Sequence, residues 1–370
     1  MKTRKILFYT NSLDPQSGGA LFSQIVLIEE FIKRGIEVKI IVNKKRKREI
    51  SLNFPVIYLN AKYGDIERPF KLKKIIEEEK PDAVLSNMLP QNITTSIAKT
   101  LYKKNNIKFI GISRNSSSYY HYGSKWKIPY RLFIKKMYEN LDYIVGIADD
   151  VIEDLKKTFF IKDDKLKVIH IGLNPEEIRR KAEENLPEEY KEIFKKNRIL
   201  INVARLIPQK NQKILIEILE IIKREIPDVK LVFVGEGKSR KELEDFAKLK
   251  GLEKDVIFTG FQKNPFKFIK RSDIFLLSSL FEGGPRVMKE SMFLGVPVVA
   301  FKTSGMFVDV LSEGTGILVP PFDKQKFAKE VMNLLKNDEL LNEYKIKSLK
   351  KAEEFHIKNY ADKYLELIES

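Results

Sequence analysis

Two pairs of charged residues have the types and spacing needed to hold a phosphorylated ligand. Arg205 and Lys210 are five positions apart, directly after an apolar segment at 199–203. A planar guanidinium and a compact ammonium group in one loop can converge on a diphosphate. Glu282 precedes and Glu290 follows the point near 285 where a helix is expected to begin. Such carboxylates can accept hydrogen bonds from vicinal hydroxyls, but an acidic helix start and solvated surface cations would give the same pattern.

Adjacent glycines occur in two loops, as Gly18-Gly19 and as Gly283-Gly284. Glycine lets a ligand approach the backbone closely, and the N–H groups at the start of a helix attract an anion. The spacing is not that of the dinucleotide fingerprint or of the P-loop, which argues against NAD enzymes and ATPases. Either glycine pair could bind a phosphate or belong to an ordinary turn.

These loops follow short apolar segments that alternate with helical patterns along the whole chain. Short β-rich segments separated by helices indicate parallel, doubly wound sheets, so the predicted fold class is α/β. Ligands of such sheets bind outside the C-terminal ends of the strands, which for two facing domains is the cleft between them. We expect strands at 6–9, 38–42, 56–59, 83–86, 109–112, 143–145 and 168–171, and again at 199–203, 231–234, 256–258, 274–277 and 298–300.

A charged segment with two prolines separates the two sets of strands. We predict an N-terminal Rossmann-like domain at 1–175 and a linker with a helix at 176–198. A C-terminal Rossmann-like domain would follow at 199–345. A final helix at 346–370, with its helical pattern at about 344–368, would cross back over the first domain.

Composition excludes several classes of chemistry. The 370-residue chain has no cysteine, which excludes disulfides, Cys-ligated zinc, iron–sulfur clusters and a thiol nucleophile. Its three histidines show no metal-ligand spacing, so we expect no metal. Nothing in the sequence marks a site for another cofactor, and we expect none. The apolar stretch at 6–9 is too short for a signal peptide, and no segment approaches the length of a membrane span. We therefore expect a cytoplasmic protein, or one that is peripheral on the cytoplasmic membrane face.

The net charge of +17 is concentrated at 44–48 and 125–136. In the second segment Trp126, Tyr130 and Phe133 are interleaved with basic residues. This mixture suits an anionic membrane surface, and it is equally typical of a solvated helix face with inward-turned aromatic rings. The charge is also compatible with a nucleic-acid-binding protein. No nucleic-acid-binding motif is present, however, and we expect no nucleic-acid partner.

The second half of the chain resembles a known family through several motifs in order. Glu282-Gly283-Gly284-Pro285 followed by Glu290 is similar to the E-x7-E motif of the retaining GT-B glycosyltransferases. The first domain resembles the family chiefly through Ser17-Gly18-Gly19. Across the whole second domain the chain resembles glycosyltransferase family 4, of the group 1 type, at 203–205, 235–237, 258–261, 297–300 and 316–320.

The resemblance implies a GT-B enzyme in which the second domain binds a nucleotide-diphosphate sugar, with a UDP-sugar favoured over a GDP-sugar. The first domain would bind a glycan or lipid-linked acceptor. Transfer would retain the anomeric configuration without a metal, because fixed cations stabilise the departing diphosphate. The chain accordingly has no Asp-x-Asp triplet. Arg205 and Lys210 would hold the diphosphate, Glu282, Gly283 and Gly284 the sugar and phosphate, Glu290 the ribose, Gly260, Phe261 and Gln262 the base, and Gly18 and Gly19 would close over the phosphates.

Two loops depart from the pattern of the family. Relatives often carry a histidine, close to an arginine, after the strand that corresponds to 109–112. Here Arg114 is present and the nearest histidine, His121, comes several residues later. We assign both residues to the acceptor side, and His121 is equally compatible with a plain surface histidine. The loop at 305–309 lacks the Pro and Glu that relatives often place there.

Other functions are possible on the same architecture. A nucleotide-sugar epimerase or a phosphorylase could share the two-domain fold. Neither accounts as well for Arg205, Lys210 and the two glutamates together. A phosphorylase would also need a pyridoxal lysine, which nothing in the sequence marks.

Overall fold

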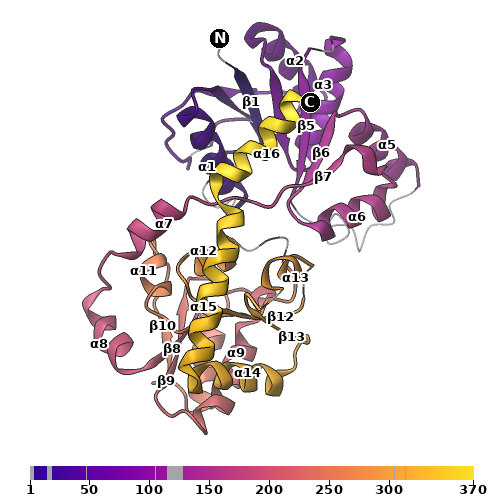
Figure 1. Ribbon diagram of the computed structural model, residues 1–370. Helices are drawn as coiled ribbons and strands as arrows, with labels where there is room; N and C mark the ends of the chain where they lie inside the picture. The colour runs from indigo at the N-terminus through magenta and orange to yellow at the C-terminus, as the bar shows by residue number, and fades with distance from the viewer. Residues whose placement is uncertain are drawn as a thin grey trace. The chain divides into compact units, whose positions relative to one another are not determined.

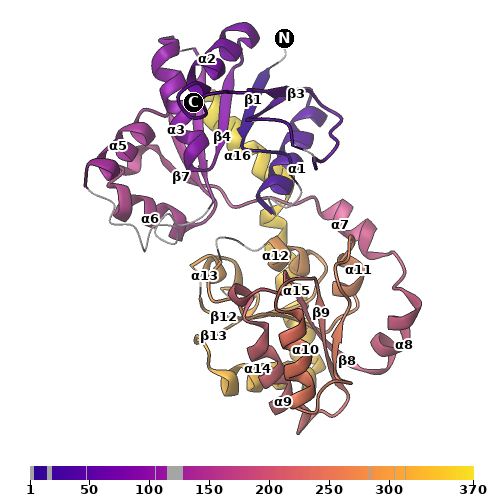
Figure 2. The same ribbon diagram turned by 180° about the vertical axis from the view of Figure 1, so that it is seen from behind.

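The chain divides into two compact units (Figures 1 and 2). A computed structural model describes residues 4–14, 19–46, 48–104, 106–114, 128–282, 284, 286–303, 305–312 and 314–370. The first unit comprises Met1–Gly172 together with Ile357–Ser370, and the second comprises Leu173–His356. The second unit is therefore one continuous segment inserted between the two parts of the first. Within these described ranges, no helix combines the length and the apolar character needed to cross a membrane.

The first unit is built on a parallel sheet. Its described residues form seven strands in the order β3-β2-β1-β4-β5-β6-β7. Strand β1, third in this order, pairs with both β2 and β4, so the strand order runs outward in two directions, as in doubly wound folds. The elements are β1 (Lys5–Thr10), α1 (Gly19–Lys33), β2 (Glu37–Val42), β3 (Val56–Tyr58), α2 (Arg68–Glu79), β4 (Ala83–Asn87), α3 (Leu89–Tyr102), β5 (Lys108–Ser113), α5 (Ile128–Glu139), β6 (Tyr143–Gly146), α6 (Asp149–Phe159), the 3-10 turn η2 (Asp163–Lys165) and β7 (Leu166–Val168).

Alternate residues of β1 are buried on opposite faces of this sheet. Leu7 and Tyr9 join one hydrophobic cluster with side chains of α2, α3, α5 and α6. Phe8 packs against Phe31 of α1, with the two ring centroids 6.0 Å apart. Helices cover both faces, which explains why the strands are almost entirely apolar.

Helix α16 (Ile357–Glu369) completes the first unit beside α1 (Figure 1). Arg34, just after α1, donates hydrogen bonds to Asp362 Oδ1 at 2.5 Å and to the Lys358 carbonyl at 3.0 Å. A Cβ atom on Gly172 would lie 2.4 Å from the Cβ of Tyr360, so the close packing of α16 needs glycine there. The predicted return of the C-terminal helix to the first domain is confirmed.

The second unit is built on another parallel sheet. Its described residues form six strands in the order β10-β9-β8-β11-β12-β13. Helices α9, α10 and α14 pack on it and share one hydrophobic cluster with its strands (Figure 2). Two Rossmann-like sheets confirm the predicted fold class. The elements are α7 (Pro175–Ala182), α8 (Glu188–Lys196), β8 (Arg198–Val203), η3 (Pro208–Lys210), α9 (Gln212–Lys223), β9 (Val229–Val234), α10 (Arg240–Leu249), β10 (Val256–Phe258), α11 (Phe266–Ile269), β11 (Ile274–Leu277), α12 (Arg286–Phe293), β12 (Val298–Phe301), α13 (Gly305–Leu311), β13 (Ile317–Val319), α14 (Lys324–Lys336), α15 (Asp338–Ala352) and η4 (Glu353–Phe355).

Three segments differ from their predicted structure. The single helix expected at about 344–368 is two helices, α15 and α16, separated by η4. The Leu173 N–H donates to the Phe355 carbonyl at 2.9 Å, and Leu173 forms a bridge with His356, so the backbone there is paired outside the helix. Strand β7 lies at Leu166–Val168 rather than 168–171, because Leu166 is in register with Ile144. The expected linker at 176–198 contains most of α7 and all of α8, and it belongs to the second unit.

Candidate functional site

The candidate donor-side residues follow β8 and β11, which are neighbours at the centre of the second sheet. The strand order reverses between them, since β9 and β10 continue outward from β8 while β12 and β13 continue outward from β11. Loops at the C-terminal ends of two such strands diverge and leave the crevice in which open α/β sheets bind ligands. The sheet therefore brings the loop at 204–211 next to the loop at 278–284.

Hydrogen bonds hold these two loops together. The Leu280 N–H donates to the Gln209 carbonyl at 2.9 Å, and Gln209 Nε2 donates to the Phe281 carbonyl at 3.1 Å. Ser278 Oγ donates to the Lys210 carbonyl at 2.8 Å. The sequence analysis did not single out Gln209 or Ser278. The signal that could have found them is a polar side chain in each of two loops that follow buried strands.

Lys210 and Glu282 form an ion pair across this reversal of strand order. Ser279 Oγ donates to the same carboxylate oxygen, Glu282 Oε1, at 2.6 Å. The Lys210 and Glu282 side chains are largely buried, with 17% and 8% of their surfaces exposed. A carboxylate oxygen that accepts from both neighbours is held in place and partly neutralised, which favours hydrogen bonding to a ligand over nucleophilic attack. The resemblance implies that Arg205, Lys210 and Glu282 act at the sugar diphosphate, and the structure brings two of these three together.

Arg205, the third of them, is exposed in the same loop. A Cβ atom on Gly235 would lie 1.9 Å from the Ala204 carbonyl oxygen, and one on Gly237 would lie 2.2 Å from that of Leu206. These two glycines let the loop after β9 lie directly against the backbone that carries Arg205. The backbone is therefore fixed on one side, while the guanidinium remains accessible to a ligand.

The loop after β10 lies beside the loop after β9, because these two strands are neighbours in the sheet. The Gly235 N–H donates to the Gly260 carbonyl at 2.9 Å. Gly260 has a φ of +72°, a backbone conformation that favours glycine. Phe261 next to it is 78% exposed and offers a flat surface on which a base could stack. Gln262 Nε2 donates to the Thr259 carbonyl at 2.9 Å, which fixes the turn.

Glu290 lies on α12, where it is buried beside Arg286. Arg286 Nη2 is 3.4 Å from Glu290 Oε1. Burial raises the pKa of Glu290, and the charge of Arg286 offsets part of this rise. Arg286 was not singled out from the sequence, although its i,i+4 spacing to Glu290 could have indicated the pair. Gly284 has a φ of +146°, and Gly283 lies outside the described residues.

In the first unit Arg114 directly follows β5 and is buried. Its Nε donates to Asn87 Oδ1 and its Nη1 to Ser23 Oγ, each at 2.6 Å. Asn87 is the last residue of β4, and Ser23 lies in the first half of α1. Of the other residues predicted for this unit, Gly19 begins α1, whereas Gly18 and His121 lie outside the described residues.

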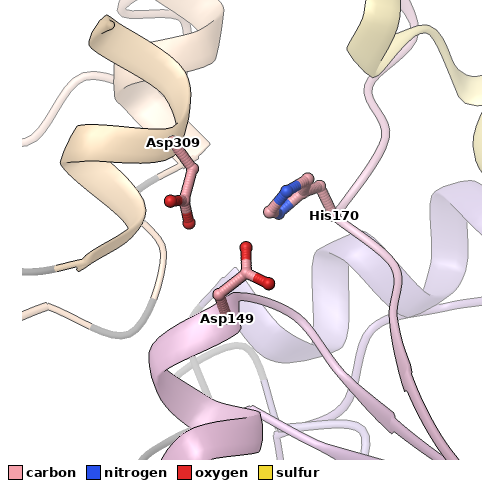
Figure 3. Close-up of side chains that lie close together, drawn as sticks. All are labelled: Asp149, His170 and Asp309. Atoms are coloured by element: carbon pink, nitrogen blue, oxygen red, sulfur yellow. The ribbon is translucent and has the colours of Figure 1, made fainter.

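A carboxylate and a histidine lie close together elsewhere in the first unit. Asp149, in the first turn of α6, and His170, after β7, present possible ligand atoms within 4.8 Å of each other (Figure 3). His170 Nδ1 is 3.1 Å from the Ile147 carbonyl oxygen. Asp309, drawn in the same figure, belongs to α13 of the second unit. Two protein ligands are fewer than a typical zinc site uses, so this pair does not by itself define a metal centre.

Both units match sequence models of known families. Residues 183–351 match the family described as glycosyl transferases group 1, and residues 17–177 match glycosyltransferase family 4. The chain is a glycosyltransferase. The family resemblance and the expectation of a sugar-transferring enzyme are therefore confirmed.

This glycosyltransferase is 29% identical over 283 residues to an uncharacterised glycosyltransferase of Methanocaldococcus jannaschii, which covers 75% of the chain and 67% of that protein. It is also 29% identical over 226 residues to N-acetylgalactosamine-N,N'-diacetylbacillosaminyl-diphospho-undecaprenol 4-alpha-N-acetylgalactosaminyltransferase of Campylobacter jejuni. That match covers 61% of the chain and 59% of the relative. Anabaena HepE in complex with UDP has a TM-score of 0.82 and 18% identity, with 99% of each chain covered. This likeness shows the shared two-domain fold.

Proposed function

We propose that this glycosyltransferase moves a sugar from a nucleotide-diphosphate sugar to a lipid-linked or other membrane-associated saccharide, with retention of the anomeric configuration and without a metal. The observation that carries the proposal is the Lys210–Glu282 ion pair between the loops after β8 and β11. It puts a cation for a phosphate beside a carboxylate for hydroxyl groups. A sugar diphosphate presents both kinds of group within one molecule.

Lys210 and Arg205 would stabilise the leaving group. Breaking the bond between the anomeric carbon and the diphosphate places negative charge on the departing oxygen. Fixed cations in a partly dehydrated loop stabilise that charge most when they need little reorientation. Lys210 is already held by Glu282, and the Arg205 fork can bind two phosphate oxygens. With two such cations the reaction needs no divalent metal.

Glu282 would bind hydroxyl groups of the transferred sugar rather than attack its anomeric carbon. Its Oε1 already accepts hydrogen bonds from Lys210 and Ser279. We therefore assign retention to departure and attack on the same face of the sugar. The bond to the diphosphate breaks, the acceptor oxygen bonds to the anomeric carbon, and the acceptor proton passes to the leaving phosphate.

The remaining donor contacts are proposed for the nucleoside and the phosphates. Ionised Glu290 would accept hydrogen bonds from the two ribose hydroxyls, and Phe261, flanked by Gly260 and Gln262, would stack on the base. The backbone at Gly18 and Gly19 would close over the phosphates. The UDP bound to Anabaena HepE, a protein of the same fold, supports a UDP-sugar over a GDP-sugar.

The acceptor assignment draws on the first unit and on the Campylobacter relative, whose name gives a diphospho-undecaprenol-linked acceptor. Helix α5 exposes 72% of Ile128, 52% of Leu132 and 43% of Phe133. Arg131 and Lys136 belong to the same helix. Apolar side chains beside cations suit peripheral binding to an anionic membrane, where the acceptor would be located.

Calorimetric titration with UDP, GDP, ADP and their common sugar conjugates, with and without EDTA, tests the donor assignment. We expect UDP and a UDP-sugar to bind most tightly, with an affinity that EDTA does not change. Product analysis by NMR with a lipid-linked acceptor then tests retention, because an α-configured donor should give an α-linked product. Loss of binding in EDTA would contradict metal independence. Epimerised donor without any acceptor would favour an epimerase.

Vesicle sedimentation tests the membrane assignment. Binding should require anionic lipid, weaken as salt increases, and fall in the double variant Leu132→Ser/Phe133→Ser. The matched control is Leu249→Ser, which removes another exposed leucine, 79% exposed, from the second unit. Equal binding of the wild type to neutral vesicles would contradict the assignment.

A further inference from the structure

Arg114 is a buried cation whose charge is not compensated by any ion pair within the described part of the chain. Its surface is 4% exposed. The acceptors of its two hydrogen bonds, Asn87 Oδ1 and Ser23 Oγ, are neutral. The remaining nitrogen, Nη2, is also buried and has no hydrogen-bond partner among the residues that the structure describes. Buried charges are normally paired, because an uncompensated charge loses its hydration and gains no electrostatic attraction in exchange.

Other arginines of the chain have a carboxylate partner, which Arg114 lacks among the described residues. Arg34, Arg198 and Arg240 each form an ion pair with a carboxylate. Their side chains are 25%, 37% and 35% exposed, so water already screens part of their charge. Arg114 is more buried than any of these three and has the greater need of an anion.

The segments of the first unit that lie outside the described residues have no acidic side chain that could supply this anion. Residues 1–3, 15–18, 47, 105 and 115–127 contain neither Asp nor Glu. The hydrogen-bond partners of Arg114 carry no negative charge either. Within this unit a ligand is therefore the natural source of the counter-charge.

A second donor lies beside Arg114 in the same network. Asn87 Nδ2 donates to Gln24 Oε1 at 3.4 Å, which links Gln24 to the arginine. Gln24 Nε2 is buried and, within the described ranges, has no hydrogen-bond partner. Burial raises the pKa of Tyr364 on α16 well above its usual value, and the charge of Arg114 opposes part of that rise. Two buried donor atoms without described partners, Arg114 Nη2 and Gln24 Nε2, thus belong to one hydrogen-bond network.

The position of this network is that of a ligand site. Asn87 ends β4, and Arg114 follows β5. Gln24 belongs to α1, which follows β1. The strand order of the first sheet reverses between β1 and β4, and open α/β sheets bind ligands outside the C-terminal ends of the strands at that point.

We infer that Arg114 and Gln24 form a subsite for a phosphate group, and that the acceptor carries this phosphate. The guanidinium fork matches two phosphate oxygens, and the amide N–H of Gln24 can donate to a third. A neutral saccharide would supply hydroxyl groups but would leave the charge of Arg114 uncompensated. The phosphate binding stands on the first unit alone, whereas the statement about the acceptor rests on the proposed transferase function.

Calorimetric titration of the full chain with inorganic phosphate, in saturating UDP, tests the subsite without requiring turnover. UDP occupies the donor cations of the second unit, so the remaining phosphate binding reports on the first. We expect binding that falls at least tenfold in Arg114→Met and severalfold in Gln24→Met, with Arg114→Lys in between. Arg4→Met is the matched control and should bind phosphate like the wild type, since Arg4 belongs to the same unit, is 40% exposed and is paired with Glu369.

Thermal unfolding separates a ligand-binding arginine from a structural one. Without phosphate, Arg114→Met should unfold at the same temperature as the wild type or higher, because the variant removes a buried uncompensated charge. The stabilisation by phosphate should disappear in the same variant. Absence of phosphate binding to the wild type, equal binding to Arg114→Met, or equal binding of chloride would each overturn the subsite. If Arg114→Met does not fold, Gln24→Met decides by the same criteria.

Transfer kinetics test whether the phosphate belongs to the acceptor. With a saccharide linked to a short prenyl diphosphate, Arg114→Met should raise the acceptor KM at least tenfold and leave the donor KM unchanged. With the same saccharide on a neutral prenyl ether, the variant and the wild type should have equal KM values. An unchanged KM for the diphosphate acceptor, together with Arg114-dependent binding of inorganic phosphate, would overturn the acceptor and leave a site for free phosphate. Phosphate binding without any transfer would instead contradict the proposed function.

Discussion

The two units differ in how the charge of a buried or partly buried cation is balanced. In the second unit Lys210 is paired with Glu282, and that carboxylate is also bound by Ser279. In the first unit Arg114 is more deeply buried, and among the residues that the structure describes it donates only to neutral oxygens. The comparison indicates that the second unit holds its candidate site ready through internal contacts. In the first unit, a bound ligand would compensate the buried charge of Arg114.

Replacement of Lys210 should have the largest effect on the donor side of this comparison. We expect Lys210→Met to lower kcat by about 10- to 1,000-fold, because the variant loses a fixed cation at the leaving group. The measurement is steady-state transfer at saturating donor. Lys213→Met is the matched control, since Lys213 is 49% exposed and paired only at the surface with Glu242. A wild-type kcat for Lys210→Met would remove this lysine from the mechanism.

The next test concerns the close contact of Gly235 with the backbone of the loop that carries Arg205. It asks whether this backbone contact keeps the donor loop in place. Gly235→Ala should destabilise the protein by about 3 kcal/mol, because the new Cβ would meet the Ala204 carbonyl oxygen and φ is +149°. UDP affinity should fall with it. Gly251→Ala is the control, since φ is +68° but nothing lies within 4 Å, and it should cost about 1 kcal/mol. Urea unfolding measures the stability of each variant, and calorimetry measures its UDP affinity. An equal loss of stability in the two variants would argue that the contact between the loops is not the cause.

Paired carboxylates away from the sites test whether the two units differ only locally. In the second unit burial opposes ionisation of Asp255, but hydrogen bonds from Lys223 and Lys230 outweigh it and lower its pKa below 3.8. Asp255→Asn should therefore cost about 2 kcal/mol of stability near pH 7. The difference from the wild type should disappear as pH falls from 3.8 through the lowered pKa, because the stabilising ionised form is lost there.

The corresponding variant of the first unit is Glu79→Gln. Burial again opposes ionisation, and hydrogen bonds from Lys39 and Lys5 lower the pKa of Glu79 below 4.5. We expect a similar cost near pH 7 and a similar loss of the difference at acidic pH, both measured by urea unfolding at several pH values. A difference that persists at low pH in either variant would point to lost packing rather than lost charge.

The smallest expected effect concerns the pH dependence of donor binding. Burial raises the pKa of Glu290 above 4.5, and the ionised carboxylate accepts hydrogen bonds from the ribose hydroxyls more strongly than the protonated acid does. UDP affinity should therefore decline severalfold as pH falls through this raised pKa. Glu290→Gln should bind UDP more weakly at neutral pH and show a flatter profile between pH 5 and 8. The same slope in both proteins would assign the titration to another group.

The sequence predicts the fold better than the contacts within the site. Apolar strands separated by helices predict two doubly wound sheets, because strands covered on both faces must be apolar throughout. The proximity of Lys210 and Glu282 depends on β8 lying beside β11, and local patterns do not determine which strands pair. The break at 353–356 depends on a hydrogen bond from Leu173, which is far away in sequence. The burial of Arg114 was also not predicted, although the absence of acidic residues from 115–127 is a signal that could have been used.

The two points at which the chain passes between the units are adjacent in the second unit, where Leu173 pairs with His356. Helix α16 buries its own Tyr360 and Tyr364 in the first unit, yet this helix is synthesised only after the whole second unit. On the ribosome the order of completion is therefore reversed relative to the order of synthesis. The second unit can fold as soon as residue 356 has emerged, while the first unit still lacks the helix that packs beside α1. Chaperones that bind nascent chains should therefore contact residues 5–172 for longer than residues 173–356.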